Sequence, residues 1–323
     1  MHPCEALFQG RHLPALLPAC DHYAGTEKLM RKSLLYQQEI GPYFDITFDC
    51  EDGAEVGAEL AHAELVGTLI ASKENYFNRV GVRVQDTRHP CFEQSIRIIC
   101  RLAAKRVAYV TLPKIEDLVE LNRAIAIVNE HAETAGRYDL SIHVLIESQG
   151  ALVEVFDIAK HPQVACLSFG IMDFVSSHFG AIPAAAMKSP GQFQHPLVTR
   201  AKLEIAAACH AYGKVASHNV STDISNAAVV ASDAKQAMTE FGYTRMWSIH
   251  PSQITPILTA FAPSIAELED ASAILHVAQS NSWAPIQHNG TLHDRASYRY
   301  YWTILQRAKA CGQPVPELAA KFL

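Results

Sequence analysis

Residues 107–147 read VAYVTLPKIEDLVELNRAIAIVNEHAETAGRYDLSIHVLIE, and they contain one complete strand–helix–strand repeat. The β-branched and apolar runs at 107–113 and 141–147 predict strands, and the segment 116–136 between them predicts a helix that ends at a glycine. The apolar stripe of that helix consists of Leu118, Leu121, Ile125 and Val128. Two parallel strands joined by a crossover helix need roughly 30 residues or more, which this stretch provides.

The same alternation continues on both sides of this repeat. Further strands are predicted at 13–20, 44–50, 80–85, 164–170, 214–220 and 245–251. Eight strands alternating with helices, such as the one expected at 197–213, make a closed (β/α)8 barrel, whereas an open doubly wound sheet is the alternative. No G-x-G-x-x-G or G-x-x-x-x-G-K-[ST] motif follows the first strand, so a nucleotide-binding open sheet is not favoured. We therefore predict an α/β fold, a TIM barrel.

The pattern changes after residue 263. Ser264, followed three residues later by Glu267, is typical of a helix that begins with a capping box. Within the barrel, the long interval before the seventh strand leaves room for an inserted loop at 183–196. We expect a catalytic barrel over 1–263 and a C-terminal helical extension, or lid, over 264–323.

Composition excludes several classes of protein. The chain has 27 Lys plus Arg against 33 Asp plus Glu, and this acidic balance argues against a nucleic-acid binder. No apolar run approaches the roughly 18 residues needed to cross a bilayer, and the first residues do not resemble a secretory signal. The eight cysteines contain no C-x-x-C pair, which favours free thiols over disulfides or zinc. We expect a cytoplasmic protein without nucleic-acid or membrane partners.

Charged and ionisable residues gather at the ends of the predicted strands, where (β/α)8 enzymes carry their active sites. They are Asp49, Glu51, Asp52, Arg83, Lys114, Glu147, Asp173, His218 and His250. Each has a structural alternative. Glu147 could be the first polar residue of a loop, Asp173 could cap a helix, and the three acids after the second strand could form a solvated loop.

Taken together, these residues indicate a particular chemistry. Carboxylates without a Cys or His ligand pattern select a hard cation such as Mg²⁺, which binds two protein carboxylates and keeps its remaining sites for water and substrate. Arg83 adds a planar group suited to a carboxylate or an enolate. A metal ion, an arginine and spare carboxylates favour a reaction that makes or breaks a bond next to a carbonyl.

At these residues the sequence resembles the citrate lyase beta-subunit-like proteins of the HpcH/HpaI aldolase superfamily, over about residues 11–263. The matching segments, in order, are FDITFDCEDGA, VGVRVQD, VTLPKIED, HVLIESQGAL, LSFGIMDF and WSIHPSQITPILTAFAP. The resemblance implies a Mg²⁺-dependent carbon–carbon lyase that cleaves or forms β-hydroxyacyl thioesters of citryl, malyl or citramalyl type through an enolate.

The resemblance also implies roles for individual residues. Glu147 in LIES and Asp173 in FGIMD match the metal ligands, and Glu147 also borders the substrate. Arg83 in GVRV matches the arginine that binds the substrate carboxylate or oxo group. Glu51 and Asp52 match the paired catalytic acids of the D-x-E-D motif.

Longer relatives, similar to malyl-CoA and citramalyl-CoA lyases, carry a C-terminal lid that completes a neighbouring subunit's site with an acidic residue. The segment NGTLHDRAS resembles this lid, so Asp294 is the matching catalytic candidate. An exposed loop aspartate is the structural alternative. A lid that reaches a neighbour implies a homo-oligomer, a trimer or a hexamer.

Two regions depart from the family pattern, and one of them is the first loop, ACDHYAGTEKLMRKSL. The stretch GAEVGAELAHAELV after the D-x-E-D motif lacks the lysine and arginine that relatives usually have, where a thioester carrier's phosphates would meet cations. Lys28, Arg31 and Lys32 are the candidates to replace them. The carrier, coenzyme A or an acyl carrier, therefore stays open. A class II pyruvate-type aldolase acting on free hydroxy-oxo acids and a non-catalytic barrel that binds small oxo acids are the alternative functions.

Overall fold

The chain forms a closed barrel of eight parallel strands in a computed structural model, which describes residues 1–9, 13 and 15–323. The strands are β1 (Cys20–Ala24), β2 (Phe44–Asp49), β3 (Val80–Arg83), β4 (Val107–Leu112), β5 (Ser141–Ile146), β6 (Val164–Phe169), β7 (Val215–His218) and β8 (Arg245–Ser248). The barrel closes where Cys20 of β1 pairs with Met246 of β8. The predicted (β/α)8 barrel is confirmed, and the open sheet is excluded.

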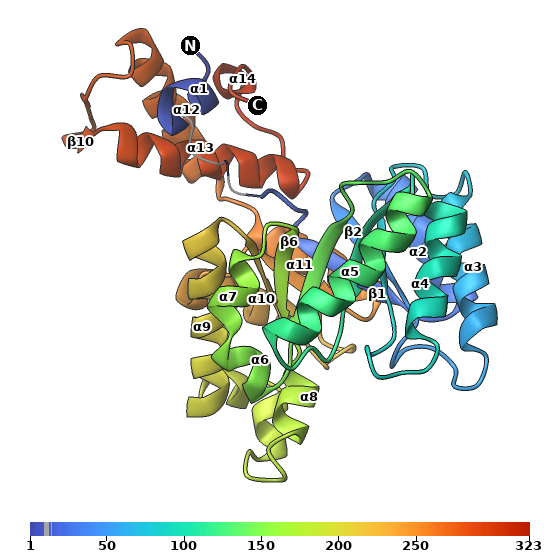
Figure 1. Ribbon diagram of the computed structural model, residues 1–323. Coiled ribbons are helices and arrows are strands. Elements are labelled where there is room, and N and C mark those ends of the chain that lie inside the picture. The colour runs from blue at the N-terminus through green and yellow to red at the C-terminus, as the bar shows by residue number, and fades with distance from the viewer. Residues whose placement is uncertain (10–12, 14) are drawn as a thin grey trace.

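Helices surround the barrel (Figure 1). They are α2 (Glu27–Ile40), α3 (Glu59–Ala71), α4 (Phe92–Ala103), α5 (Leu118–Thr134), α6 (Gln149–Val153), α7 (Val155–Lys160), α9 (Pro196–Tyr212), α10 (Ala227–Phe241) and α11 (Ile254–Phe261). The helices expected at 116–136 and 197–213 are α5 and α9. Asp117 caps α5 by accepting from the Glu120 N–H, and Gly213 ends α9 in the left-handed conformation. The expected insertion lies between α8 (Ile171–Ser176) and α9, and contains the short 3-10 turns η1 (Ala184–Met187) and η2 (Gly191–Phe193).

The first strand differs from its prediction. It was expected at 13–20, but β1 begins at Cys20 and continues through Asp21 and His22. The described residues before Cys20 form no strand, and residue 14 lies outside the described part. The prediction was wrong because it followed the apolar run, whereas the true strand carries polar side chains that find partners inside the barrel. Pro18, within the apolar run, also has no N–H to donate to a neighbouring strand.

The barrel interior next to β1, β2 and β8 is polar. Arg245 forms ion pairs with Asp21 at 3.0 Å and Asp45 at 2.6 Å, and all three side chains are buried. The hydroxyls of Thr47 and Tyr109 donate to Asp21 at 2.7 and 2.9 Å. Successive side chains of a strand point to opposite faces. The inward face of β2 therefore ends with Asp49, whereas its alternate residues, Phe44, Ile46 and Phe48, pack in the apolar core.

A second apolar core lies outside the barrel. It joins α1 (Pro3–Phe8), α12 (Ile265–Ser280), α13 (Arg295–Ala310) and α14 (Glu317–Ala320), with the hairpin β9 (Ile286–His288) and β10 (Thr291–His293) beside it. The expected capping box of Ser264 and Glu267 is present at the start of α12. The proposed division of the chain at residue 263 stays a prediction. None of the helices in the described part of the chain is long and apolar enough to cross a membrane.

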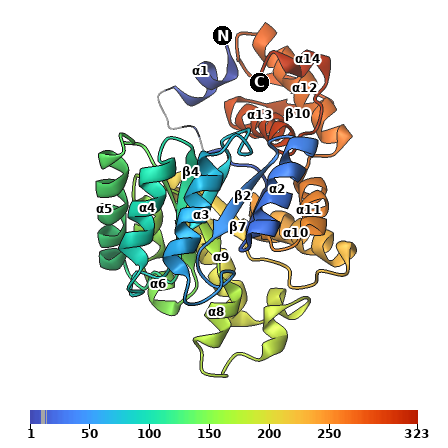
Figure 2. The same ribbon diagram turned by 90° about the vertical axis from the view of Figure 1, so that its right-hand side faces the viewer.

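This helical bundle lies at the N-terminal end of the strands (Figures 1 and 2). Ala19 and Thr244, which precede β1 and β8, line a cavity of about 360 Å³ together with Trp302 and Arg307 of α13. The Arg307 guanidinium also donates to the Phe261 carbonyl at 2.9 Å. In Figure 1, α6 and α8, which follow β5 and β6, lie at the opposite end of the barrel. The strand ends that carry the predicted site therefore face away from the chain's own bundle.

Candidate active site

Glu147 lies directly after β5 at the C-terminal rim of the barrel, and its side chain is covered. It is 4% exposed, and one carboxylate oxygen accepts the backbone N–H of Lys114 after β4. Gly170, directly after β6, leaves room for this carboxylate, because a Cβ at that position would lie 2.4 Å from Glu147 Oε2. Burial and the charge of Asp173 raise the pKa of Glu147 to about 8. Glu147 is thus part of a closed site and not the first residue of a solvated loop.

Asp173 lies in the first turn of α8, after β6. It is partly exposed, and its negative charge is one of the causes that raise the pKa of Glu147. α8 begins at Ile171 without a side-chain cap, so Asp173 does not have the capping role that was its structural alternative. The structure brings the two predicted metal ligands to the same rim.

Arg83, the last residue of β3, is held by a carboxylate on the neighbouring strand. Its Nε and Nη2 donate to the two oxygens of Asp49 at 2.7 and 2.6 Å, and its Nη1 lies 3.0 Å from Glu51 Oε2. Asp49 in turn accepts the backbone N–H groups of Glu51 and Gly53 at 3.0 and 2.8 Å. Burial by itself would lower the pKa of Arg83, but the charge and the hydrogen bonds of Asp49 have the larger effect and raise it. The guanidinium is therefore charged and fixed in orientation.

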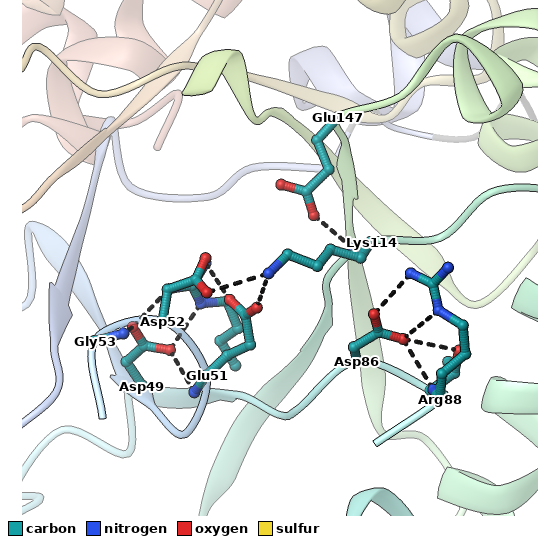
Figure 3. Close-up of polar contacts among 10 residues, drawn as sticks. Asp49, Glu51, Asp52, Gly53, Asp86, Arg88, Lys114 and Glu147 are labelled. Carbon is teal, nitrogen blue, oxygen red and sulfur yellow. Dashed lines mark hydrogen bonds and ion pairs between the residues drawn. The ribbon is translucent and has the colours of Figure 1, made fainter. Parts of the chain in front are cut away.

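Lys114 connects the two halves of the site (Figure 3). Its backbone, in the left-handed conformation at φ 52°, reaches Glu147, while its ammonium donates to Glu51 and, at 3.1 Å, to Asp52. Burial raises the pKa of Glu51. For Asp52, burial is outweighed by a hydrogen bond with Glu51 and by the charges of Arg83 and Lys114, which lower its pKa. Of the two acids, Asp52 is the more accessible, with its side chain 55% exposed against 7% for Glu51.

The residues at this rim fit a magnesium ion. Mg²⁺ is commonly bound through one or two carboxylates, with water and substrate completing its octahedral shell. Glu147 and Asp173 offer such a pair. A cation bound to both would offset the desolvation of Glu147 and the repulsion between the two carboxylates, which are the two largest causes of the raised pKa of Glu147. Among the described residues, no cluster of three or more His, Cys, Asp or Glu side chains could hold a metal ion.

Asp294 does not join this rim within one chain. It caps α13, accepting the N–H groups of Ala296 and Ser297 at 2.9 and 3.4 Å, and it is exposed. α13 belongs to the bundle at the N-terminal end of the strands, on the side of the barrel opposite α8 (Figure 1). Any contact between Asp294 and an active site of this kind therefore needs a second subunit.

Several contributors to the site were missed by sequence reasoning. Asp49 was noted only as one of three crowded acids, although it is the residue that orients Arg83. Lys114 was noted only as a charged residue at a strand end and was given no role, yet it contacts Glu51, Asp52 and Glu147. Its position after Pro113 at a strand end was the available signal. Only the folded structure shows that Lys114 turns toward these carboxylates.

The chain matches the sequence profile described as HpcH/HpaI aldolase/citrate lyase over residues 29–251. It is 55% identical to a citrate lyase from Burkholderia xenovorans LB400. The match to that crystal structure covers 100% of both chains, with a TM-score of 0.87. CitE from Mycobacterium tuberculosis, solved with magnesium, acetoacetate and coenzyme A, is 20% identical; the match covers 91% of this chain and 98% of that one at a TM-score of 0.68.

RipC from Yersinia pestis is also 20% identical, with 78% of this chain and 98% of that one covered at a TM-score of 0.59. At such identities the likeness concerns the fold alone. No protein of curated function matches the chain significantly. The profile spans more than half of the sequence, and the resemblance seen in the motifs is thereby confirmed. The chain belongs to the HpcH/HpaI aldolase/citrate lyase family, and it is a carbon–carbon lyase.

Proposed function

We propose that this protein is a Mg²⁺-dependent lyase that cleaves or forms β-hydroxyacyl thioesters of citryl, malyl or citramalyl type through an enolate. The observation that carries the proposal is the buried carboxylate of Glu147 beside Asp173, on the rim that also carries Arg83. Related structures support it, since CitE proteins of M. tuberculosis were solved with magnesium and with oxaloacetate or acetoacetate.

Glu147 and Asp173 are the residues that would hold the metal ion. When bound, Mg²⁺ supplies a positive centre that polarises a substrate oxygen and favours negative charge there. Arg83 adds a second fixed charge. An arginine has five N–H groups. Asp49 takes two and Glu51 faces a third, so two remain to bind a substrate carboxylate or the oxygen on which charge develops.

Asp52 is the proposed base. Its lowered pKa keeps it ionised at neutral pH, and its exposure leaves it open to substrate. It would take the proton of the β-hydroxyl, whose oxygen then forms a carbonyl as the neighbouring carbon–carbon bond breaks. The electron pair of that bond passes to the leaving fragment as an enolate, which is then protonated. Lys114 holds both Asp52 and Glu51 in place.

A specific observation favours a second candidate, an aldolase that acts on free hydroxy-oxo acids. Of the three cations that could replace the missing carrier-binding residues, Arg31 is paired with Glu27 and Glu74. Lys28 and Lys32 lie exposed on α2. Because Arg31 is already paired, only two of these three cations are left for the phosphates of coenzyme A.

A substrate panel tests the proposal and separates the two candidates. Purified protein is assayed with Mg²⁺ on malyl, citramalyl and citryl thioesters and on free hydroxy-oxo acids, and each assay is repeated with EDTA. We expect cleavage of at least one thioester, lost with EDTA. Glu147→Gln is expected to lower kcat/KM by about 10³-fold and to weaken Mg²⁺ binding, while Glu133→Gln, a change at an exposed residue of α5, has no effect. Cleavage of free acids alone would favour the aldolase, and unchanged Mg²⁺ affinity in Glu147→Gln would remove the metal assignment.

We also propose that the protein is a homo-oligomer, trimeric or hexameric, in which Asp294 completes the site of a neighbouring subunit. The position of the bundle at the far end of its own barrel supports action in trans rather than in cis. Glu147→Gln and Asp294→Asn subunits are each expected to be inactive alone. When they are unfolded and refolded together, partial activity should return, because some sites in mixed oligomers combine an intact Glu147 with an intact Asp294 of the neighbouring subunit. No recovery in verified mixed oligomers would contradict the lid.

A further inference from the structure

A cavity of about 510 Å³ opens beside the acids at the rim. It lies among the loops that follow β2, β3 and β4, and Cys50, Glu51, Gln85, Pro90 and Lys114 line part of it. In Figure 3, Lys114 reaches toward Glu51 and Asp52 on one side, and the pair of Asp86 and Arg88 lies on the other. A substrate held near Glu147 and Arg83 therefore has room to extend into this cavity.

Gln85 is the unusual residue in the cavity wall. Its side chain is 3% exposed, and neither its Nε2 nor its Oε1 has a hydrogen-bond partner among the described residues. Buried amides are almost always hydrogen-bonded, because an unpaired donor or acceptor has lost its water without compensation. Gln85 follows Arg83 by two residues, so the unpaired amide lies next to the predicted substrate site. A partner that arrives with the substrate would account for it.

The charges around the cavity restrict what that partner can be. Arg88 is paired with Asp86 at 2.7 and 3.0 Å, and Lys114 is paired with Glu51 and Asp52. The remaining carboxylates of the wall belong to Glu55 and Glu59. Both cations of the wall are thus already neutralised, and a phosphate or carboxylate entering here would meet net negative charge. The cavity suits an uncharged group.

We propose that Gln85 is a specificity-determining residue that hydrogen-bonds an uncharged substrate group carrying both a donor and an acceptor. The amide of Gln85 itself offers one of each, so a secondary amide or a hydroxyl complements it. The inference rests on the proposed function, because it concerns the substrate of that same site. An amide would belong to the arm of a thioester carrier, and a hydroxyl to a free hydroxy-oxo acid.

Two matched pairs of probes distinguish these sources without requiring turnover. The amide pair is the acetyl thioester of N-acetylcysteamine and S-ethyl thioacetate, which lacks the amide. The hydroxyl pair is 5-hydroxy-2-oxopentanoate and 2-oxopentanoate, which lacks the hydroxyl. None of the four has the β-hydroxyl that the proposed retro-aldol cleavage requires. Binding to the full-length protein is measured by calorimetry with Mg²⁺ present, for wild type, Gln85→Met and Gln85→Glu.

We expect wild type to bind one richer probe about tenfold more tightly than its matched partner, as a good buried hydrogen bond provides. Gln85→Met keeps the side-chain volume but removes the amide, so it should lose this discrimination while binding the poorer probe as wild type does. Its Tm without ligand should equal or exceed that of wild type, because an unpaired buried amide has been removed. A merely structural glutamine would instead give a lower Tm and unchanged probe binding.

Gln85→Glu keeps the shape but loses the donor, and we expect it to lose the discrimination too; it decides the question if Gln85→Met does not fold. The proposal is overturned if wild type discriminates within neither pair, or if the variants discriminate as wild type does. Failure of the proposed function is a separate result. It would appear as absent turnover in the substrate panel, whereas these binding measurements use probes that are not cleaved.

Discussion

Two arginines at different depths of the same barrel make similar ion pairs but lie in different surroundings. Arg245, at the start of β8, is fully buried and faces Asp21 and Asp45 from two neighbouring strands. Arg83, at the end of β3, is held by Asp49 but retains N–H groups at the open rim, beside a cavity. The interior pair connects only protein groups, whereas we propose that the rim pair presents a fixed charge to a substrate.

The comparison shows how position along a strand separates structural from functional use of the same chemistry. The inward residues of β2 form a column in which Asp45 and Thr47 are satisfied by neighbours inside the barrel. Asp49, the next inward residue, is satisfied by Arg83 and by backbone N–H groups of its own loop.

The largest expected effect is on stability, from Arg245→Met. Removing the guanidinium leaves Asp21 and Asp45 buried without a cation, and breaking such a buried pair typically costs about 3–5 kcal/mol. Chemical denaturation followed by circular dichroism measures the loss. A double change, Arg245→Met with Asp21→Asn, should recover part of it. A loss below about 1 kcal/mol would mean that the interior ion pairs are not structurally important.

Arg83→Lys should mainly affect catalysis. A lysine is a point charge that cannot bind Asp49 through two parallel hydrogen bonds and still face the substrate. We expect kcat/KM to fall about 10²-fold, in the range seen when one charge-stabilising donor is lost, with a smaller loss of unfolding free energy than in Arg245→Met. An equal loss of stability in the two variants, with full activity in Arg83→Lys, would contradict the different roles proposed for the two arginines.

The raised pKa of Glu147 predicts a pH dependence of stability. Its pKa is about 8 in the folded protein against about 4.5 for an ordinary glutamate. Between these values the folded state binds more protons than the unfolded state, so unfolding free energy falls as pH rises from about 5 to 8, by about 2–4 kcal/mol. Metal-free protein should therefore show a falling Tm over this range, because ionised Glu147 lacks a counter-charge.

Two controls sharpen this measurement. Glu147→Gln should flatten the decline of Tm with pH, and saturating Mg²⁺ should reduce or reverse it, since the ion binds the carboxylate only in its ionised form. The same competition makes Mg²⁺ affinity increase with pH up to about 8. A Tm profile of Glu147→Gln that still follows wild type would assign the titration to another group.

The smallest expected effect belongs to Glu55, in the cavity wall. Glu55→Gln should leave the unfolding free energy within about 0.5 kcal/mol, because the residue is exposed. It should raise kcat/KM for a coenzyme A thioester a few-fold relative to the uncharged N-acetylcysteamine thioester, and high salt should abolish the difference. An equal change for both substrates would mean that the cavity charge does not select against anions.

Much of the site could be anticipated from strand ends alone. Glu147 and Asp173 follow consecutive strands, and parallel strands of a closed barrel bring their carboxyl ends to one rim. Their convergence therefore needed only the periodicity of the chain. By contrast, the inward turn of Lys114, the contact of Gly170 with Glu147 and the unpaired amide of Gln85 depend on neighbouring loops whose paths have no periodic signal.

The sequence by itself determined the alternation of strands and helices, the family and the set of charged residues at the rim, because these depend on local periodicity and on motifs. The tertiary structure alone decided where β1 begins, since Asp21 is acceptable in a strand only when Arg245, more than two hundred residues later, pairs with it. It also decided that the bundle covers the opposite end of the barrel and that Glu147 holds its proton more tightly than a free glutamate. Burial and charge pairing arise between residues that are distant in the chain, and they exist only after folding.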